Sequence, residues 1–243
     1  MGAVGEDGQF LEEILDKSGV DTSNILHVDG SSGHAIIQVN AEGQNCIVIF
    51  GGANRRLTAD YVRKGLDKGE KGDYVLLQNE TSETGTIISE AAARGMKVVF
   101  NPSPLTEDIE KLPLDKVSVF ILNEIEGAQL SGVSAESSYS EILDALCRRY
   151  PKAEMVLTLG SQGVICRVDG KDYTHGIFKV RSVDTTAAGD TFCGYYLAGR
   201  CAGLDIPETL KRASAASAIA VSRAGAAPSI PTAAEVDEFL EKQ

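Results

Sequence analysis

The chain has 243 residues, which is enough for one large α/β domain. Aliphatic residues are plentiful, tryptophan is absent and 25 glycines are present, which suits short buried strands joined by tight turns. A net charge of −12 argues against a nucleic-acid partner, which needs a basic stripe, but not against a nucleotide, whose phosphates are held by local N–H groups. No apolar run approaches the roughly 18 residues of a membrane helix, so no membrane partner is expected.

The five cysteines include no C-x-x-C pair, and their number is odd. This pattern favours reduced, buried thiols in a cytoplasmic protein. The first residues have neither the basic nor the apolar stretch of a signal peptide. The three histidines are scattered, and we assign them no metal-binding or catalytic role.

In the first quarter of the chain, apolar spacing predicts a helix over residues 9–18. Alternation of apolar and polar residues predicts a β-hairpin with strands 34–40 and 45–50 and a turn at 41–44. A second helix is predicted over residues 57–68.

Short apolar strands then alternate with helices, which is typical of parallel strands joined by crossover connections. The predicted strands are 74–78, 97–100, 117–122 and 155–159, and the predicted helices are 83–94 and 139–150. Residues 164–168 and a segment through Val180 are predicted as antiparallel additions at one side of the sheet. Three helices are predicted to close the chain, near 187–200, 207–222 and 232–242.

The run Val183-Asp-Thr-Thr-Ala-Ala-Gly-Asp190 is the strongest chemical signal in the sequence. Small residues let the backbone approach a ligand closely, and the N–H groups at a helix start form an anion pocket. A carboxylate such as Asp190 in that pocket can accept a proton from a substrate hydroxyl while the N–H groups stabilise a transferring phosphoryl group. The local alternative is an ordinary capped helix that uses small residues for packing.

Two further segments have both a chemical and a local interpretation. Residues 158–163 (Thr-Leu-Gly-Ser-Gln-Gly) follow a buried-looking strand, and their glycines allow close backbone contact with a ligand, but a plain hairpin turn fits equally well. Asn123 and Glu126 follow another strand; taken alone, they indicate a helix start with a capping residue and a first-turn acid.

Together these segments closely resemble the ribokinase (PfkB) family of sugar kinases. Residues 184–190 are similar to the family signature D-T-x-[GA]-A-G-D, residues 158–163 to its nucleotide loop, and residues 123–126 to its N-x-x-E motif. Four more segments match in order and spacing: residues 2–7, 52–54, 101–104 and 223–229.

The resemblance implies a ribokinase-like, three-layer α/β/α fold with a mostly parallel central sheet. It implies one kinase domain over residues 1–243, in which residues 34–50 are the remnant of a β lid. A homodimer formed through that lid is also expected.

The resemblance also implies roles for individual residues. Asp190 inherits the role of catalytic base, with Ala187, Ala188 and Gly189 as the anion hole. The residues expected to bind ATP are Asn123, Thr158, Leu159, Gly160, Ser161, Gln162, Gly163, Gly189 and Ser214. Ser214 stands where the family often has an asparagine against adenine, a departure from its pattern.

Metal and sugar contacts follow from the same resemblance. Glu126 is expected in the environment of Mg²⁺, and Glu80 and Asp190 at the sugar. The residues that match the ring around K⁺ are Asp184, Thr186, Ala220, Arg223, Gly225 and Ser229. Taken alone, residues 220–229 are only the end of a helix with a glycine stop.

One part of the family pattern has no counterpart here: the N-terminal strand whose aspartate binds the sugar, and the Gly-Gly segment after it. We therefore expect exposed apolar surface and strand edges, and weak phosphorylation of sugar by the chain as written. Two functions remain open. The first is ATP-dependent phosphorylation of a sugar hydroxyl, with D-ribose favoured over another sugar or a nucleoside. The second is a non-catalytic, nucleotide-binding remnant of a sugar kinase.

Overall fold

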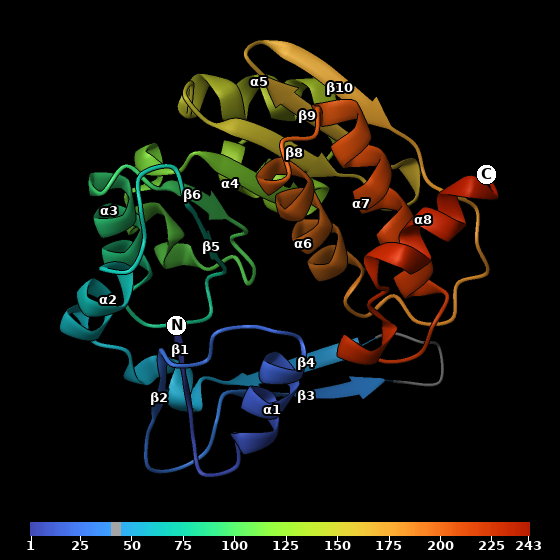
Figure 1. The fold of residues 1–243 in the computed structure, drawn as a ribbon. Helices are drawn as coiled ribbons and strands as arrows, with labels where there is room; N and C mark the ends of the chain where they lie inside the picture. The colour runs from blue at the N-terminus through green and yellow to red at the C-terminus, as the bar shows by residue number, and fades with distance from the viewer. Residues whose placement is uncertain (40–44) are drawn as a thin grey trace. The chain divides into compact units, whose positions relative to one another are not determined.

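The computed structural model describes residues 1–39 and 45–243 and divides into two compact units, Met1–Ser118 and Val119–Gln243. In Figure 1 the first unit is coloured blue to green and the second green to red. Among the described residues, no helix combines the length and the apolar character that crossing a bilayer would require.

The first unit opens with a small β-α-β element. Strand β1 (Gly2–Val4) pairs in parallel with β2 (Ile25–His27), and helix α1 (Gln9–Lys17) connects them. The predicted helix is therefore present, but none of its residues is buried, and the side chain of Phe10 is 57% exposed.

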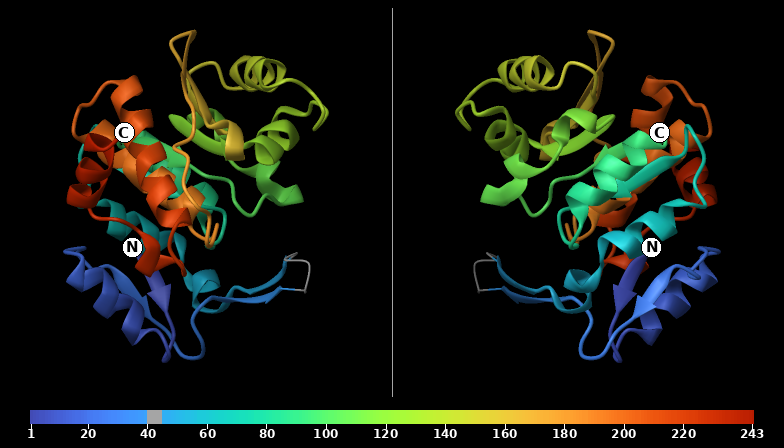
Figure 2. Two further views of the ribbon diagram at one scale, coloured as in Figure 1. Left: turned by 90° about the vertical axis from the view of Figure 1, so that its right-hand side faces the viewer. Right: turned by 90° about the vertical axis from the view of Figure 1, so that its left-hand side faces the viewer.

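The predicted hairpin consists of β3 (His34–Val39) and β4 (Asn45–Phe50), paired antiparallel so that His34 lies opposite Phe50. It extends away from β1 and α1 as a two-stranded ribbon (Figure 2). Ile36 and Ile37 project to opposite faces of this ribbon and are each more than half exposed, so both faces are apolar and open to solvent. The predicted turn at 41–44 lies outside the described residues.

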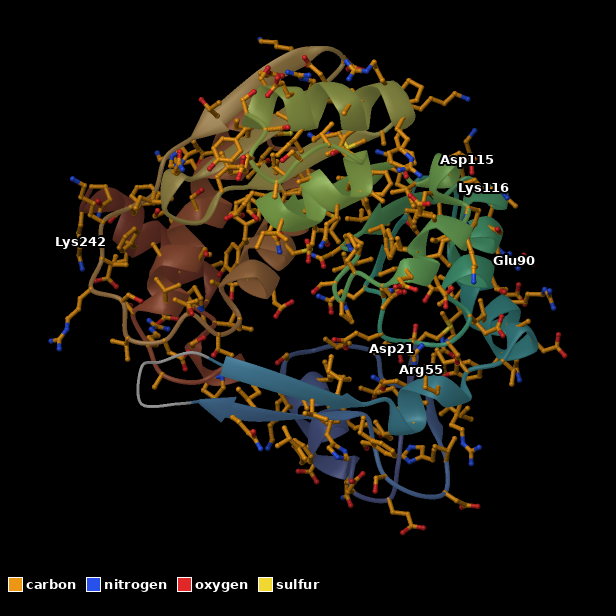
Figure 3. The ribbon with its side chains drawn as sticks, turned by 180° about the vertical axis from the view of Figure 1, so that it is seen from behind. Asp21, Arg55, Glu90, Asp115, Lys116 and Lys242 are labelled. Atoms are coloured by element: carbon orange, nitrogen blue, oxygen red, sulfur yellow. The ribbon has the colours of Figure 1, made fainter. Side chains whose placement is uncertain are left out.

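Two α-β units follow the hairpin in the first unit. Their elements are α2 (Ala59–Leu66), β5 (Tyr74–Leu77), α3 (Thr84–Ala93) and β6 (Lys97–Phe100), and the two strands pair in parallel. The Thr58 hydroxyl caps α2 by accepting the N–H of Tyr61. Glu90 of α3, labelled in Figure 3, accepts from Arg63 of α2 over 2.9 Å and from Arg94 at the end of its own helix over 2.6 Å. The bond to Arg63 ties the two helices together.

The second unit is built on four paired strands. Strand β7 (Val119–Asn123) pairs in parallel with β8 (Glu154–Thr158), which pairs antiparallel with β9 (Val164–Val168), which pairs antiparallel with β10 (Lys171–His175). Nearly every residue of β7 and β8 is buried, as their continuous apolar runs predict. The prediction that the last strand continues through Val180 is wrong, because the chain leaves the sheet after His175 and packs Phe178 against the closing helices.

Five helices accompany this sheet in the second unit. They are α4 (Glu124–Ser131), α5 (Tyr139–Arg149), α6 (Ala188–Cys201), α7 (Ile206–Val221) and α8 (Ala233–Glu241). The three predicted closing helices are confirmed within a few residues. Gly199 on α6 lies directly against Thr209 on α7, since a Cβ at position 199 would come within 3.0 Å of the threonine methyl. The small residue therefore lets α6 and α7 pack closely.

The cysteines of the second unit are all free. Cys166 and Cys193 are buried, as predicted, and Cys147 is half-buried. For Cys201 the prediction is wrong, because the last residue of α6 faces solvent.

Candidate functional site

Helix α6 begins within the strongest sequence motif. Ala187 is its N-cap and has left-handed backbone angles, φ 61° and ψ 8°, which are costly for any residue with a Cβ. The helix starts at Ala188, so Asp190 lies in its first turn. The first N–H groups of a helix have no acceptor inside it and carry partial positive charge. This turn is therefore able to receive an anion.

Residues 158–163 connect β8 to β9, so the hairpin-turn interpretation describes their backbone correctly. The Thr158 hydroxyl donates to the carbonyl of Leu122 on β7 over 3.2 Å, and the Leu159 N–H donates to the carbonyl of Gly163 over 2.8 Å. Gly163 has φ +95°, and a Cβ there would lie 2.1 Å from the His175 carbonyl oxygen. The loop is thus held at both ends and passes close to the end of β10.

Asn123 ends β7 and caps α4. Its Oδ1 accepts the N–H of Ile125 at 3.0 Å and that of Glu126 at 2.8 Å, while Glu126 Oε2 accepts the N–H of Asn123 at 3.0 Å. This is a reciprocal capping box, as the local interpretation of the sequence expects. Glu126 is buried by this arrangement, whereas the neighbouring Glu124 lines the cavity described next.

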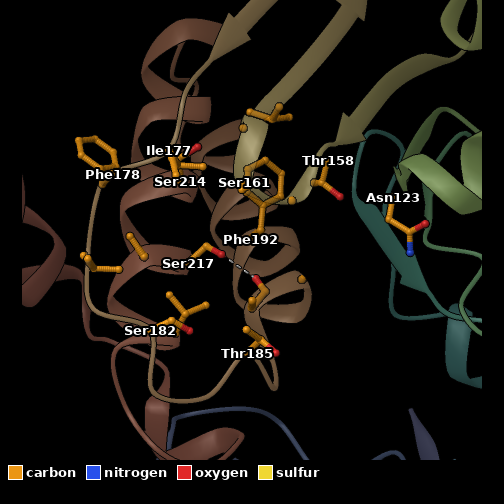
Figure 4. Close-up of a pocket in the computed structure, with 18 of the residues that line it drawn as sticks. Asn123, Thr158, Ser161, Ile177, Phe178, Ser182, Thr185, Phe192, Ser214 and Ser217 are labelled. Atoms are coloured by element: carbon orange, nitrogen blue, oxygen red, sulfur yellow. Dashed lines mark hydrogen bonds between the residues drawn. The ribbon is translucent and has the colours of Figure 1, made fainter. Parts of the chain in front are cut away.

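A cavity of about 800 Å³ lies within the second unit, between the ends of these elements. Several of the predicted nucleotide-binding residues line it: Asn123, Thr158, Gly160, Ser161, Gly163, Gly189 and Ser214. Ala188 of the expected anion hole lines it as well. Figure 4 shows the side chains of Asn123, Thr158, Ser161 and Ser214 in this wall. The structure therefore brings together residues that are distant in sequence.

The cavity has two chemically different parts. One part is formed by small residues of the 158–163 loop and of the first turn of α6. The other contains Ile177, Phe178 and Val221, together with the hydroxyl-bearing residue Ser214. On α7, Ser217 donates to the Ala188 carbonyl over 3.1 Å and so connects this helix to the start of α6 (Figure 4).

Other predicted residues do not belong to the cavity wall. Leu159 is buried, and Gln162 donates to the Tyr139 hydroxyl over 2.8 Å. Ala187 and Asp190 adjoin the wall through Ala188 and Gly189. Glu80 lies in the exposed turn after β5, in the first unit.

The segments expected around K⁺ are connected by Asp184. Its Oδ1 accepts the N–H of Thr186 at 2.9 Å, and its Oδ2 accepts the N–H of Gly225 at 3.0 Å. These hydrogen bonds, led by those of Thr186, lower the pKa of the Asp184 carboxyl. Ala220 is buried near the end of α7, and Ser229 donates to the Ala226 carbonyl over 2.7 Å. The predicted members thus lie on two segments that Asp184 joins.

Burial also affects a thiol next to this turn. Desolvation raises the pKa of Cys193 to about 12, and the nearby Asp190 carboxylate adds to the shift. Cys193 is therefore a packed, neutral side chain on α6 and not a nucleophile.

The sequence analysis did not identify the wall between β10 and α6. Ile177, Phe178 and Lys179 all line the cavity, and their segment contains neither helix nor strand. Among the described residues of the wall, Lys179 is the only basic one and Glu124 the only acidic one. Composition gave no signal for this segment, because its place depends on packing between distant elements.

This arrangement suits a ligand that is anionic at one end and flat and apolar at the other. Backbone N–H groups and small residues accept phosphates, and the apolar part accommodates an aromatic ring. The Asp190 carboxylate lies in the same first turn of α6, directly after the cavity-lining Gly189.

Comparisons with known proteins agree with this chemistry. The model of the pfkB family of carbohydrate kinases matches residues 1–233. A ribokinase from Haemophilus influenzae is 34% identical over 247 residues, which covers 99% of this chain and 80% of the relative.

Two solved structures are also similar to this chain. A ribokinase from Cryptococcus neoformans in complex with ADP has a TM-score of 0.85 and 31% identity, covering 98% of this chain and 81% of that one. A ribokinase from Arabidopsis thaliana complexed with ribose and ATP has a TM-score of 0.85 and 28% identity, covering 99% of this chain and 81% of that one.

These matches confirm the predicted ribokinase-like α/β fold with its mostly parallel sheet. The matched residues span both compact units and include the motif at the start of α6 and the loop between β8 and β9. The chain therefore belongs to the pfkB family of carbohydrate kinases.

Proposed function

We propose that this protein transfers the γ-phosphoryl group of ATP to a hydroxyl of D-ribose, giving D-ribose 5-phosphate and ADP. The observation that carries the proposal is the position of Asp190 in the first turn of α6, between Gly189 and Phe192, which both line the cavity. Ribokinases at 30–34% identity, and a ribokinase structure that contains ribose and ATP, support the choice of sugar.

In the proposed complex the nucleotide phosphates face the 158–163 loop and the N–H group of Gly189 at the start of α6. The base lies toward Ile177, Phe178 and Ser214, where the wall is apolar apart from one hydroxyl. The described residues give Ser214 no hydrogen-bond partner, so its hydroxyl is available to a polar edge of the base.

For phosphoryl transfer, the protein mainly has to position the reactants and stabilise the developing charge. Asp190 takes the proton of the attacking hydroxyl as its oxygen forms a bond to the γ-phosphorus. The bond from phosphorus to the bridging oxygen breaks, and ADP leaves with the electron pair. The N–H groups at the start of α6 stabilise charge on the phosphoryl oxygens during transfer. Glu80 is proposed at the sugar.

Magnesium fits the donor set as a companion of the nucleotide. Mg²⁺ usually keeps several waters and uses one or two carboxylates plus substrate phosphates. The carboxylates at the start of α4 meet this need: Glu124 lines the cavity, and Glu126 lies buried beside Asn123. When bound, the ion neutralises charge on the phosphates.

Potassium is proposed between the two segments that Asp184 joins, with backbone carbonyls from the 184–186 and 220–229 regions as ligands. Oxygen donors suit such a hard cation. If the ion orders the start of α6, KCl should tighten ADP binding relative to tetramethylammonium chloride at the same ionic strength. Equal affinity in the two salts would remove potassium from the proposal.

Residues 1–243 are proposed to act as one kinase domain with 34–50 as its lid. The two open apolar faces of the β3–β4 hairpin support a homodimer formed through that lid, since paired hairpins would bury them. The free thiols support a reducing, cytoplasmic location.

Two measurements test the proposed function. Calorimetry with ATP and Mg²⁺ should detect binding to the folded protein at millimolar nucleotide or below. ADP release, followed with a panel of pentoses, hexoses and nucleosides, should depend on the sugar and be fastest with ribose. A folded sample that binds no nucleotide would contradict the site itself. Faster turnover of another acceptor would keep the kinase and replace the substrate.

A further inference from the structure

The segment between β10 and α6 forms one wall of the cavity without the support of regular secondary structure. It lines the cavity over Ile177–Val180, yet it belongs to no helix and no strand. Hydrogen bonds of a sheet or helix therefore do not fix its position. Packing of its side chains against neighbouring elements has to do so.

Phe178 provides that packing. Its ring lies 5.3 Å from the His175 ring, centroid to centroid, and 5.4 Å from the ring of Phe239. The second contact is edge-to-face, with an interplanar angle of 79°. This is a favourable geometry for two aromatic rings. Phe178 is thus held between the end of the sheet and the C-terminal helix α8.

Helix α8 is itself firmly attached to the body of the second unit. Val236 is fully buried in a cluster with Ala215, Ala216 and Ile219 of α7, and Phe178 and Phe239 pack against the same cluster. The Tyr195 hydroxyl of α6 donates to the carbonyl of Pro231, just before α8, over 2.7 Å. A ring carried by this helix therefore offers a fixed surface to a segment that has no regular secondary structure.

We propose that Phe239 is a positioning residue for nucleotide binding. It does not line the cavity, but its ring holds Phe178 and with it the wall against which the base is placed. This inference rests on the proposed function, since it takes the cavity to be the nucleotide site. Loss of the ring lets the wall move outward, so the base loses contact area while the phosphate end keeps its donors.

The consequence is a specific kinetic pattern. Phe239→Leu should weaken ADP binding, and raise the KM for ATP, by about 2- to 10-fold, the range expected for losing one aromatic pair. The kcat should stay close to that of the unchanged protein, because the α6 turn and Asp190 are untouched. Phe239→Tyr keeps the ring and should keep the affinity.

The matched control is Leu240→Ala, which removes apolar volume from the same cluster on the same helix. It should lower the melting temperature while leaving the affinity for ADP unchanged. Phe239→Met, which keeps volume without the ring, replaces Phe239→Leu if that variant does not fold.

Calorimetry with ADP and Mg²⁺ on the whole chain, with melting curves of each variant, makes the test. Weak binding by Phe239→Leu beside normal binding by Leu240→Ala supports the inference. Normal ADP affinity in Phe239→Leu, or equal losses in both variants, overturns it. Failure of the unchanged protein to bind ADP would instead contradict the proposed function, so the two failures are distinguishable.

Discussion

Arg223, in the loop after α7, and Glu235, in the first turn of α8, form an ion pair with a nitrogen–oxygen distance of 2.6 Å. The other carboxylate oxygen of Glu235 accepts the N–H of Thr232, the N-cap of α8, over 2.7 Å. One carboxylate thus completes a helix cap and also connects α8 to the loop that contains Gly225. Both contacts require the ionised form.

These contacts predict a pH dependence of stability. The Thr232 N–H, and then Arg223, lower the pKa of Glu235 from 4.5 to about 2. Because the folded-state pKa is the lower one, the unfolded chain takes up the proton first as the pH falls. The stabilisation is complete above about pH 4.5 and is lost progressively toward pH 2.

Urea unfolding from pH 7 to pH 2 should therefore show Glu235→Gln to be less stable at neutral pH, with the difference closing as the pH falls. Glu238→Gln on the same helix is the control, since among the described residues Glu238 pairs only with Lys242, four residues on. A constant difference between Glu235→Gln and the unchanged protein at every pH would contradict the assignment.

The strained N-cap of α6 predicts a stabilising substitution. Ala187 has φ 61°, and glycine adopts such angles without the steric cost of a Cβ. Ala187→Gly should raise the free energy of unfolding by about 1 kcal/mol. Ala188→Gly, one position later and inside the right-handed helix, should be neutral or destabilising by up to about 1 kcal/mol. Denaturant titration gives the free energy of unfolding of both variants. A lower value for Ala187→Gly than for the unchanged protein would contradict the proposed backbone strain at position 187.

The positive charge of Lys179 is predicted to strengthen nucleotide binding. It is the only basic residue among the described residues of the cavity wall, and a pair of charges 4 Å apart in water is worth roughly 1 kcal/mol. Lys179→Gln should therefore raise the dissociation constant for ATP about fivefold at low salt and less at high salt.

Arg181→Gln removes the same charge from the same segment, but position 181 does not line the cavity, so it should leave the affinity nearly unchanged. Calorimetric titrations at two salt concentrations separate the two variants. If both substitutions weaken ATP binding equally, the affinity depends on the overall positive charge of the segment. A direct contact between Lys179 and the nucleotide would then be contradicted.

The sequence predicts best the elements whose signals are local. The strand predicted at 155–159 is apolar except for Thr158, and β8 occupies residues 154–158. The Asn123–Glu126 capping box can be foreseen because its donors and acceptors are within one helical turn. The start of α6 at Ala188 follows from its small-residue motif in the same way.

Features that depend on distant residues were not predictable. Nothing near Phe178 in the sequence indicates that Phe239 will lie against it, and the strand expected through Val180 has already ended at His175. Exposure has the same limit: the spacing in 9–18 predicts a helix with an apolar face, but it cannot say whether anything covers that face.

The central claim is that Asp190 is the base of an ATP-dependent sugar kinase. The most direct test is ribose-dependent release of ADP by the unchanged protein and by Asp190→Asn, at enzyme concentrations high enough to detect slow turnover, with ADP binding measured on both samples. The account predicts that turnover falls by about 100-fold or more while ADP binding persists. Turnover by Asp190→Asn at the rate of the unchanged protein, or no sugar-dependent turnover by an unchanged protein that binds ADP, would contradict it.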